Sequence, residues 1–308
     1  MTEPRRTPTM ADVARAAGVS HQTVWRALSG AATVKADTRT RILAAAERLG
    51  YRPNQAARRL VQGRTGSIGI LGPDAAEFGP TSSLFAVERA VRAAGYFPLI
   101  GSTAPDDARA ALEFLLGQSI EALVVIASHR AIADALAEMR PDIPVVTLHA
   151  GSAAGGAGAH AVTIDQGQGI RLLVDHLAGL GHTRLQYLSG PPDFLEAQLR
   201  ADAFRAAVRE RGMPELPQLA GDWSPASGFA AIRDLDPGAT ALVCGNDQMA
   251  LGAMHALAAA GRAVPQELSV VGFDDVPEAA HLLPPLTTVH QDFPAVGRRA
   301  VEVLVRML

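Results

Sequence analysis

The chain has a single cysteine, Cys244, among its 308 residues. This scarcity excludes an internal disulfide framework and a cysteine-based zinc site. No run of roughly 18 or more apolar residues occurs, and the polar start from Met1 to Pro8 lacks the apolar stretch of a signal peptide, so neither membrane insertion nor export is indicated. With 48% apolar residues, we expect a cytoplasmic globular protein with a large buried core and no membrane partner.

Motifs for catalysis or for a tightly bound cofactor are also missing. There is no G-x-G-x-x-G or Walker A loop, none of the nine histidines forms an H-x-x-x-H pair, and no serine lies in a G-x-S-x-G elbow. The paired carboxylates Asp106-Asp107 and Asp274-Asp275 would point to opposite sides of an extended chain, which does not favour a glycosidase or metal site. We therefore expect no enzyme activity, no metal and no cofactor.

Charge is unevenly distributed along the chain. Residues 1–64 contain 12 Arg or Lys against four Asp or Glu, a net charge of +8, whereas residues 65–308 carry a net charge of −11. A basic segment favours a polyanion such as DNA. The remainder is expected to bind a different, uncharged or mixed partner.

The basic front segment predicts a helix-turn-helix. Thr9 can cap a helix that ends near Ala17, residues 18–20 make a tight turn, and Ser20 caps a second helix over 21–28. A third helix is expected from Asp37 to Leu49, ended by Gly50. Its inward residues are expected to be Ile42, Leu43 and Ala46.

The second of these helices is predicted to read DNA bases. Val24, Ala27 and Leu28 share one face and are expected to pack inward. The residues left outward near the helix N-terminus are His21, Gln22 and Arg26. Gln pairs with adenine and Arg with guanine in the major groove, so this helix has the side chains of a recognition helix. A solvated helical hairpin is the alternative.

A short connector follows, and it is predicted to form a hinge helix over 54–62. Pro53 and Asn54 open it and Gly63 closes it, with Ala57 and Leu60 on one face. Isolated helices shorter than about 12 residues are marginal in water, so we expect this one to order only with DNA and a partner copy present. Leu60 would then be a wedge in the minor groove. A plain linker is the alternative.

Residues 64–308 are predicted to alternate between strands and helices. Strands are expected at 67–71, 122–126, 145–148 and, after a flexible segment at 151–158, at 161–164, 184–188, 241–243 and 269–271. Helices are expected at 83–94, 108–118, 132–139, 168–180, 198–211 and 248–260. This pattern indicates two doubly wound α/β subdomains, each with a parallel sheet covered on both faces, and a cleft between them.

Polar residues follow several of these strands and predict a binding site. Ligands of open α/β sheets bind at the carboxyl ends of the strands, where Asn246 and Asp274 are expected, and Arg200 is expected to open a nearby helix. With the flat apolar faces of Trp223 and Phe293, this set is typical of a neutral sugar site. The alternatives are that Asn246, Asp247 or Asp275 caps a local element and that Trp223 belongs to the core.

Eight runs of sequence match a known pattern: MADVA (10–14), AGVS (17–20), QTV (22–24), YRPN (51–54), GDWS (221–224), NDQMALGAM (246–254), SVVGFDD (269–275) and PPLTTVHQDF (284–293). Together they resemble the LacI/GalR family of bacterial transcriptional regulators, along nearly the whole chain. The resemblance implies an all-α helix-turn-helix DNA-binding domain over 1–63 and a periplasmic-binding-protein-like core over 64–308.

The resemblance also implies site residues. Those implied at DNA are Ser20, His21, Gln22, Thr23, Arg26, Asn54, Ala57 and Leu60. Those implied at the ligand are Phe78, His149, Ile164, Arg200, Trp223, Asn246, Asp274, Gln291 and Phe293, with 78–80 as one wall. Two positions depart from the family pattern: Trp25 stands where a small serine is usual, and His149 stands where an acidic residue is expected.

The function implied is that of a repressor released from double-stranded operator DNA by a small, galactoside-like sugar. A homodimer is expected, with Leu251, His255, His281 and Leu282 at its surface. A corepressor-type regulator that binds a purine, a solute-binding transport protein and a sugar-modifying enzyme are the alternatives. Family members usually continue past the position of Leu308 with a further strand, so we expect either an incomplete sequence or a weakened lobe, and no tetramer.

Overall fold

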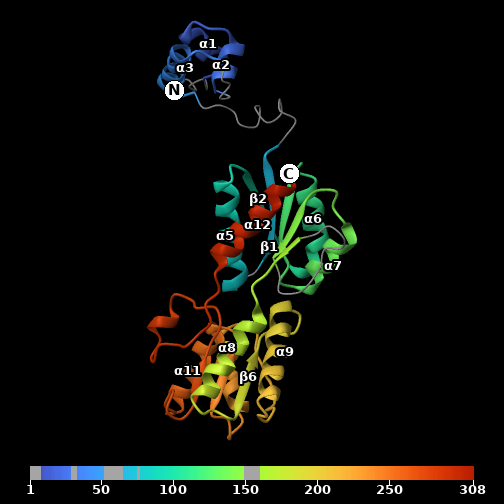
Figure 1. Ribbon diagram of the computed structural model, residues 1–308, viewed down its shortest axis with the longest axis vertical. Helices are drawn as coiled ribbons and strands as arrows, with labels where there is room; N and C mark the ends of the chain where they lie inside the picture. The colour runs from blue at the N-terminus through green and yellow to red at the C-terminus, as the bar shows by residue number, and fades with distance from the viewer. Residues whose placement is uncertain (1–7, 29–32, 52–64, 75–76, 149–159) are drawn as a thin grey trace, which may run out of the picture. The chain divides into compact units, whose positions relative to one another are not determined.

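The computed structural model describes residues 8–28, 33–51, 65–74, 77–148 and 160–308 (Figure 1). Contacts divide the chain into two compact units, Met1–Thr65 and Gly66–Leu308. The domain boundary expected between residues 63 and 64, the hinge helix expected at 54–62 and the flexible segment expected at 151–158 lie outside the described residues. No helix in the described ranges is long and apolar enough to cross a membrane.

The first unit contains three short helices. They are α1 (Met10–Ala17), α2 (His21–Leu28) and α3 (Ala36–Leu49). Thr9 and Asp12 form a capping box at the start of α1, and Gly18 and Gly50 end α1 and α3 in the left-handed conformation that glycine adopts readily. The small core is made by fully buried Val13, Val24, Ile42 and Ala45, at most 1% exposed, so the helix-turn-helix expected here is confirmed.

One core residue of this unit was wrongly expected. Leu43 was placed in the core, but it is 50% exposed. The buried face of α3 follows Ile42, Ala45 and Ala46, and Leu49 packs against it, which is the i, i+3, i+4, i+7 spacing of one helical stripe. Leu43 is one residue, or about 100° of rotation, away from that stripe and faces solvent.

The second unit has two lobes, each built on a parallel sheet. The first sheet has the order β2-β1-β3-β4-β5. Its strands are β1 (Ser67–Pro73), β2 (Phe97–Thr103), β3 (Ala122–Ile126), β4 (Val145–Leu148) and β5 (His160–Val162). The second sheet has the order β7-β6-β8-β9. Its strands are β6 (Leu185–Ser189), β7 (Leu219–Ala220), β8 (Ala241–Cys244) and β9 (Ser269–Val271).

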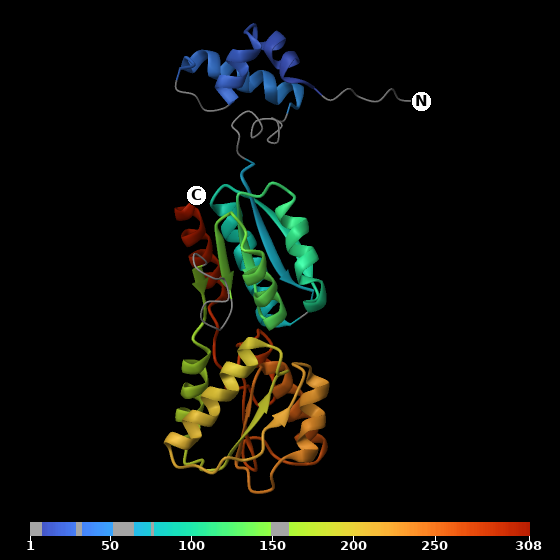
Figure 2. The same ribbon diagram turned by 90° about the vertical axis from the view of Figure 1, so that its right-hand side faces the viewer.

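Helices cover both faces of each sheet, as Figure 2 shows for the two lobes. In the first lobe, α5 (Phe78–Ala93) and α12 (Phe293–Met307) lie on one face and α6 (Ala108–Leu116) and α7 (Arg130–Met139) on the other. In the second lobe, α8 (Gln166–Gly179) and α9 (Leu195–Glu210) lie opposite α10 (Pro225–Ala231) and α11 (Asp247–Ala259). Short 3₁₀ turns are η1 (Pro105–Asp107), η2 (Ile232–Asp234) and η3 (Ala279–His281).

Strands buried on both faces explain the layers. Every residue of β3, β4, β6 and β8 is buried, and alternate side chains of a strand enter different cores. In β3, Val124 packs with α5 and α12, whereas Leu123 and Val125 pack with α6 and α7. Such strands are typical of parallel sheets between helical layers, so the predicted α/β fold of two doubly wound lobes is confirmed.

The chain crosses between the lobes at two segments that carry site residues. Residues 163–165 lead from β5 of the first lobe to α8 of the second. Residues near 291 lead back to α12, which packs along α5 (Figure 1). The two crossings are joined by a hydrogen bond from Gln166 Nε2 to Gln291 Oε1 (3.2 Å). Although α12 follows the whole second lobe in sequence, it therefore belongs to the first lobe.

Candidate functional site

The outward face of α2 carries the residues expected to read DNA. His21, Gln22 and Arg26 are exposed, while Val24 and Ala27 of the same helix are buried. The 3.6-residue repeat of the helix separates the two sets, because the inward residues must fill the core of the unit. The polar side chains are therefore presented together and free of the core.

Two further residues that the family resemblance assigns to DNA contact, Ser20 and Thr23, fix the start of α2. Ser20 Oγ accepts a hydrogen bond from the Thr23 backbone nitrogen (3.1 Å) and lies 2.8 Å from Thr23 Oγ1. Ser20 thus caps the helix as expected. The side chain of Trp25 is half-buried.

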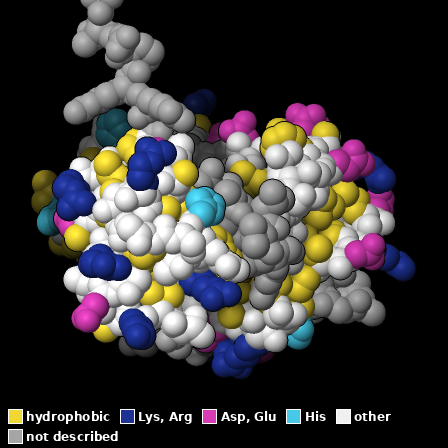
Figure 3. Space-filling view, turned by 90° about the horizontal axis from the view of Figure 1, so that it is seen from above, with side chains coloured by type: hydrophobic (Ala, Val, Ile, Leu, Met, Phe, Trp, Pro, Cys, Tyr) yellow, Lys and Arg dark blue, Asp and Glu magenta, His cyan; other side chains and the backbone are white. Residues whose placement is uncertain are grey.

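Positive charge predominates on this unit. Its described residues include six Arg or Lys against three Asp or Glu. In Figure 3, dark blue Lys and Arg side chains stand out on the left-hand part of the view, where α1–α3 lie. This charge suits a phosphate backbone. The remaining residues implied at DNA, Asn54, Ala57 and Leu60, lie outside the described residues, so their roles stay predictions.

A pocket lies between the two lobes of the second unit, at the carboxyl ends of their strands. It has about 700 Å³ of space not filled by protein atoms, part of it open to solvent. Eight of the residues that the family resemblance assigns to ligand contact line this pocket: Phe78, Ile164, Arg200, Trp223, Asn246, Asp274, Gln291 and Phe293. His149 lies outside the described residues. That the lining residues bind a ligand stays a prediction.

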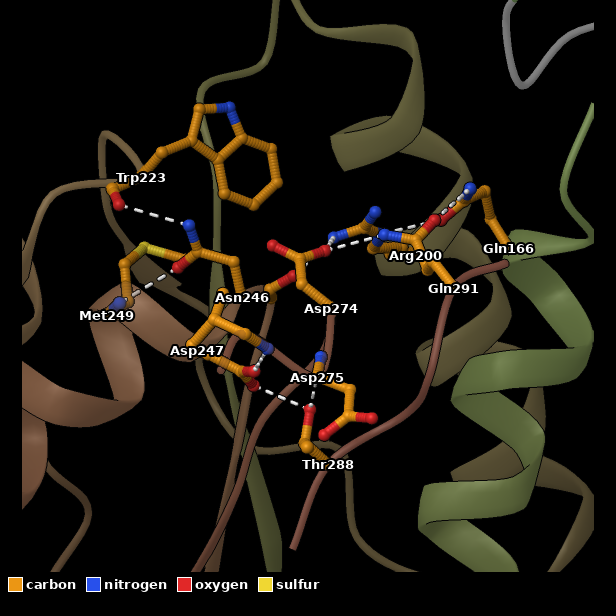
Figure 4. Close-up of polar contacts among 12 residues, drawn as sticks. Gln166, Arg200, Trp223, Asn246, Asp247, Met249, Asp274, Asp275, Thr288 and Gln291 are labelled. Atoms are coloured by element: carbon orange, nitrogen blue, oxygen red, sulfur yellow. Dashed lines mark hydrogen bonds and ion pairs between the residues drawn. The ribbon is translucent and has the colours of Figure 1, made fainter. Parts of the chain in front are cut away.

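A ring of four buried polar side chains forms one wall of the pocket (Figure 4). Arg200 Nε donates to Gln166 Oε1 (2.7 Å), and Gln291 Nε2 donates to Asp274 Oδ1 (2.6 Å). Gln166 and Gln291 are bonded to each other, and Arg200 Nη1 lies 3.8 Å from Asp274 Oδ1. Each member orients its neighbour, so the ring holds donors and acceptors in place before any ligand arrives.

Burial and the charge of Arg200 act in opposite directions on the pKa of Asp274 in the ring. Burial raises the pKa of the Asp274 carboxyl to about 7, and nearby Asp247 acts in the same direction, while the positive charge of Arg200 opposes both. The Arg200 guanidinium lies 3.9 Å from the ring centroid of Phe273, a cation–π contact. Arg200 lies in the second turn of α9, which begins at Leu195, so the expectation that it opens this helix is wrong.

Asn246 and Trp223 each serve structure and pocket together. Asn246 Oδ1 accepts from the Met249 nitrogen and caps α11, while its Nδ2 donates to the Trp223 carbonyl (3.0 Å). Trp223 is 8% exposed, belongs to the core of the second lobe and has a positive φ of 71°. Its ring lies so close to Gly190 that a Cβ there would be 2.2 Å from it, so glycine is required.

The two acids beside these residues are not part of the pocket lining. Asp247 is buried and accepts from Thr288 Oγ1 (2.6 Å) and from the Val276 nitrogen (2.9 Å), which ties α11 to the loop after β9. Asp275 is exposed and lies 2.9 Å from His290 Nδ1. The neighbouring carboxylates Asp274 and Asp275 therefore face different surroundings, as the sequence suggested. Burial also raises the pKa of Asp247.

Apolar side chains form the opposite wall of the pocket. The rings of Phe78 and Phe293 meet edge to face with centroids 5.9 Å apart, and Ile164 lies on the crossing between the lobes. Phe293 begins α12 and Phe78 begins α5, so the packing of these two helices positions both rings.

Several polar residues that were not predicted at the site also line the pocket; besides Ser83, Ser128 and Thr163, three of them have charged or amide side chains. They are Glu77, Gln166 and Glu196. Glu196 lies four residues before Arg200, so i, i+4 spacing on one helix face could have found it. Glu77 and Gln166 come from other elements, and no local signal points to them. Among the described residues, no group of three or more His, Cys, Asp or Glu side chains could hold a metal ion.

Comparisons with known proteins agree with both units. Residues 9–54 match the profile described as bacterial regulatory proteins, lacI family, and residues 174–308 match a periplasmic binding protein-like domain. The lactose operon repressor of Klebsiella pneumoniae is 33% identical over 99% of this chain and 87% of its own length. The ribose operon repressor of Escherichia coli (strain K12) is 31% identical over 97% of this chain and 93% of its own length.

Solved structures give the same answer. A lac repressor dimer bound to operator and the anti-inducer ONPF superposes with a TM-score of 0.86 at 30% identity, covering 98% of this chain and 92% of its own. A complex of the transcriptional regulator CelR with cellobiose has a TM-score of 0.71 at 29% identity, covering 97% of this chain and 92% of its own. The chain belongs to the lacI family of bacterial regulatory proteins.

Proposed function

We propose that this DNA-binding regulator is a repressor that holds operator DNA as a homodimer and leaves it when a small sugar occupies the pocket. The observation that carries the proposal is the joining of an exposed basic recognition helix and a preformed polar pocket in one chain. The exposed Gln22 and Arg26 support base reading, and the pocket between two lobes supports control by a ligand.

The pocket favours a sugar as the ligand. Arg200, Asn246 and Asp274 offer both donors and acceptors to vicinal hydroxyl groups, and Trp223, Phe78 and Phe293 offer apolar faces to a ring. Relatives named for the lactose and ribose operons, and the structure of CelR with cellobiose, support the same ligand class. A galactoside is the first sugar to test.

Exposed apolar side chains support a homodimer. Leu251 and His255 are both exposed and one turn apart on α11, and Phe229 of α10 lies beside His255 with ring centroids 5.0 Å apart. His281 is exposed and Leu282 half-buried on a neighbouring segment. A second copy with two-fold symmetry would place the same surface on both chains, and it would present two recognition helices to a near-palindromic operator.

We infer a binding role in the cytoplasm rather than a catalytic one. The relatives named above are regulators. The acid Asp274 is held by Gln291 and Arg200 within the ring, where it is suited to orienting a ligand. Incubation of the protein with a bound sugar should return the sugar unchanged.

Gel-shift titration of the full-length protein tests the proposal. DNA from upstream of the protein's own coding region should be retarded at low ionic strength, and an added galactoside or related neutral sugar should release it. Failure to bind any such fragment would overturn the operator role. Tighter DNA binding on addition of a purine base, with no effect of sugars, would replace the proposal by a corepressor mechanism.

A further inference from the structure

We propose that Glu196 and Glu77 form a second polar contact to the ligand and select a saccharide that bears an amino group. The expected order of preference is an amino sugar, then the matched neutral sugar, then the phosphorylated sugar. The inference rests on the proposed function, because it assumes that the pocket binds a saccharide. What it adds to that function is that the preferred saccharide is positively charged.

Glu196 carries an unused acceptor into the pocket. It lies in the first turn of α9, four residues before Arg200, and lines the pocket. Its Oε2 atom is buried and has no hydrogen-bond partner among the described residues. A buried acceptor without a partner costs free energy, so such an atom in a pocket indicates a donor that the ligand supplies.

Glu77 has the same property and comes from the other lobe. It stands at the N-cap of α5, yet its side chain makes no capping hydrogen bond to that helix. Its Oε2 atom is likewise buried without a partner, and the residue lines the same pocket. Two carboxyl groups, one from each lobe, therefore lack donors in the free protein. A ligand with suitable donors would satisfy both and link the lobes.

The charge balance of the pocket favours a cation. Its described lining residues include three acids, Glu77, Glu196 and Asp274, and a single base, Arg200. Arg200 already donates to Gln166 and to the Gly245 carbonyl and lies beside Asp274. The positive charge of Arg200 is thus already used in contacts of the polar ring. A further positive group would have to come from the ligand.

An ammonium group fits this environment better than a hydroxyl group. It offers three donors and a positive charge, and hydrogen bonds between charged groups are roughly twice as strong as neutral ones. A hydroxyl group offers one donor and no charge. A phosphate group would bring negative charge toward three acids, which is unfavourable in a buried site.

Titration of the same acids gives the proposal a second readout. Burial raises the pKa of Glu196 to about 7, with its own backbone amide and Arg200 opposing this, and Asp274 has a pKa raised to about 7 as well. The charged groups facing Glu196 are Arg200, Asp274 and, across the pocket, Glu77. An ammonium ligand favours the ionised carboxyls, so its binding should release protons and tighten as the pH rises through about 7.

Isothermal titration calorimetry on the full-length protein tests the preference. Matched ligands are galactose and glucose, their 2-amino-2-deoxy and 6-amino-6-deoxy derivatives, and their 6-phosphates. One amino derivative should bind about tenfold more tightly than its hydroxyl counterpart, and the phosphates more weakly than either. Repeating the titration in two buffers of different ionisation enthalpy measures the protons released.

Variants separate the acids from the rest of the pocket. Glu196→Gln keeps the size of the side chain and should remove the preference for the amino derivative while the neutral sugar still binds. Glu77→Gln, in the other lobe, should reduce the same preference. It provides the test if Glu196→Gln does not fold. Glu210→Gln, on the exposed end of α9, is the matched control and should leave all affinities unchanged.

Three results would overturn the inference. Equal affinities within every amino and hydroxyl pair, or a preference that survives both Glu196→Gln and Glu77→Gln, would do so while leaving a neutral-sugar repressor intact. No binding of any saccharide would overturn the ligand class itself, and with it both proposals.

Discussion

At the residue scale, the pocket depends on polar groups that complete one another. Gln166 and Gln291 lie 125 positions apart, yet each bonds the other and one charged residue, Arg200 or Asp274. Removing one member would leave a buried partner unsatisfied, which typically costs about 1–3 kcal/mol. The ring is therefore a preformed surface rather than a set of independent side chains.

The raised pKa values of Glu196 and Asp274 predict how stability depends on pH. In the folded protein both carboxyls have pKa values of about 7, against ordinary values of 4.5 for Glu and 3.8 for Asp. The folded protein therefore binds more protons than the unfolded chain between these limits. The stabilising contribution of the two acids is complete below about pH 4 and is lost as the pH rises through 7. Thermal melts of the free protein from pH 4 to 8 measure this.

Glu196→Gln separates this effect from other titrations. The variant cannot ionise at this position, so it should not lose stability there as the pH rises. The melting temperature of the variant minus that of the wild type should therefore increase by about 5 °C between pH 5 and pH 8. Glu210→Gln, which is exposed, should follow the wild type throughout. Parallel curves for Glu196→Gln and wild type would refute the buried, raised-pKa carboxyl.

At the element scale, two helices of the second lobe approach each other through paired glycines. A Cβ on Gly252 of α11 would lie 1.8 Å from the Pro225 carbonyl oxygen of α10, and one on Gly228 of α10 would lie 2.1 Å from the Met249 carbonyl oxygen. The backbones therefore touch at the crossing. This crossing supports α11, the helix that the pocket residue Asn246 caps.

Gly252→Ala should destabilise the protein strongly. The added methyl group meets rigid backbone, so we expect a loss of about 3 kcal/mol and a fall of roughly 10 °C in melting temperature. The control is Gly179→Ala on α8, where nothing lies within 4 Å and the change should be neutral or slightly stabilising. Equal melting temperatures for the two variants would refute the close crossing.

The recognition helix α2 gives a prediction of its own. Gln22→Ala and Arg26→Ala should each weaken binding to the operator by about 1–3 kcal/mol, because each removes one base contact. The measurement is a gel-shift titration against the operator and against unrelated DNA. Arg48→Ala removes the same charge from an exposed position on α3 and should have a smaller effect. If it weakened operator binding as much as Arg26→Ala, bulk charge rather than α2 would be responsible.

Local signals in the sequence predicted some elements well and others poorly. α1, α2 and α3 were expected almost at their observed bounds, because Thr9, Ser20 and Gly50 mark their ends. The edge strand β2 was missed, since Pro98 and Gly101 interrupt its pattern and three of its seven residues are exposed. α5 begins five residues before the expected Ser83, because proline is tolerated in a first helical turn and Pro80 lies there.

The pocket was predictable only in part. Asn246 and Asp274 follow buried strands, and this position alone indicates a site at the carboxyl ends of a sheet. Gln166 reaches the pocket because the chain crosses from the first lobe to the second just before α8, whereas Glu77 lies in the β1–α5 connection of the first lobe. No spacing along the sequence carries that information. Trp223 combines both readings considered for it, since it belongs to the core and lines the pocket.

At the scale of the whole molecule, the proposed binding to a near-palindromic operator requires two copies of the chain. Leu251 is 37% exposed on α11 within the apolar surface that includes Phe229 and His255. Leu251→Asp should therefore give monomers in analytical ultracentrifugation and weaken operator binding, because each half-site then binds alone. Leu172→Asp, at a 56% exposed position on α8, should remain dimeric. A dimeric Leu251→Asp variant would contradict this placement of the interface.

In the proposed mechanism, sugar binding and operator binding oppose each other. Linkage makes the effect reciprocal, so the most direct measurement is the Kd of the sugar for full-length protein with and without saturating operator DNA. We expect a Kd about 5- to 150-fold higher when operator is bound. An identical Kd in both titrations would contradict it.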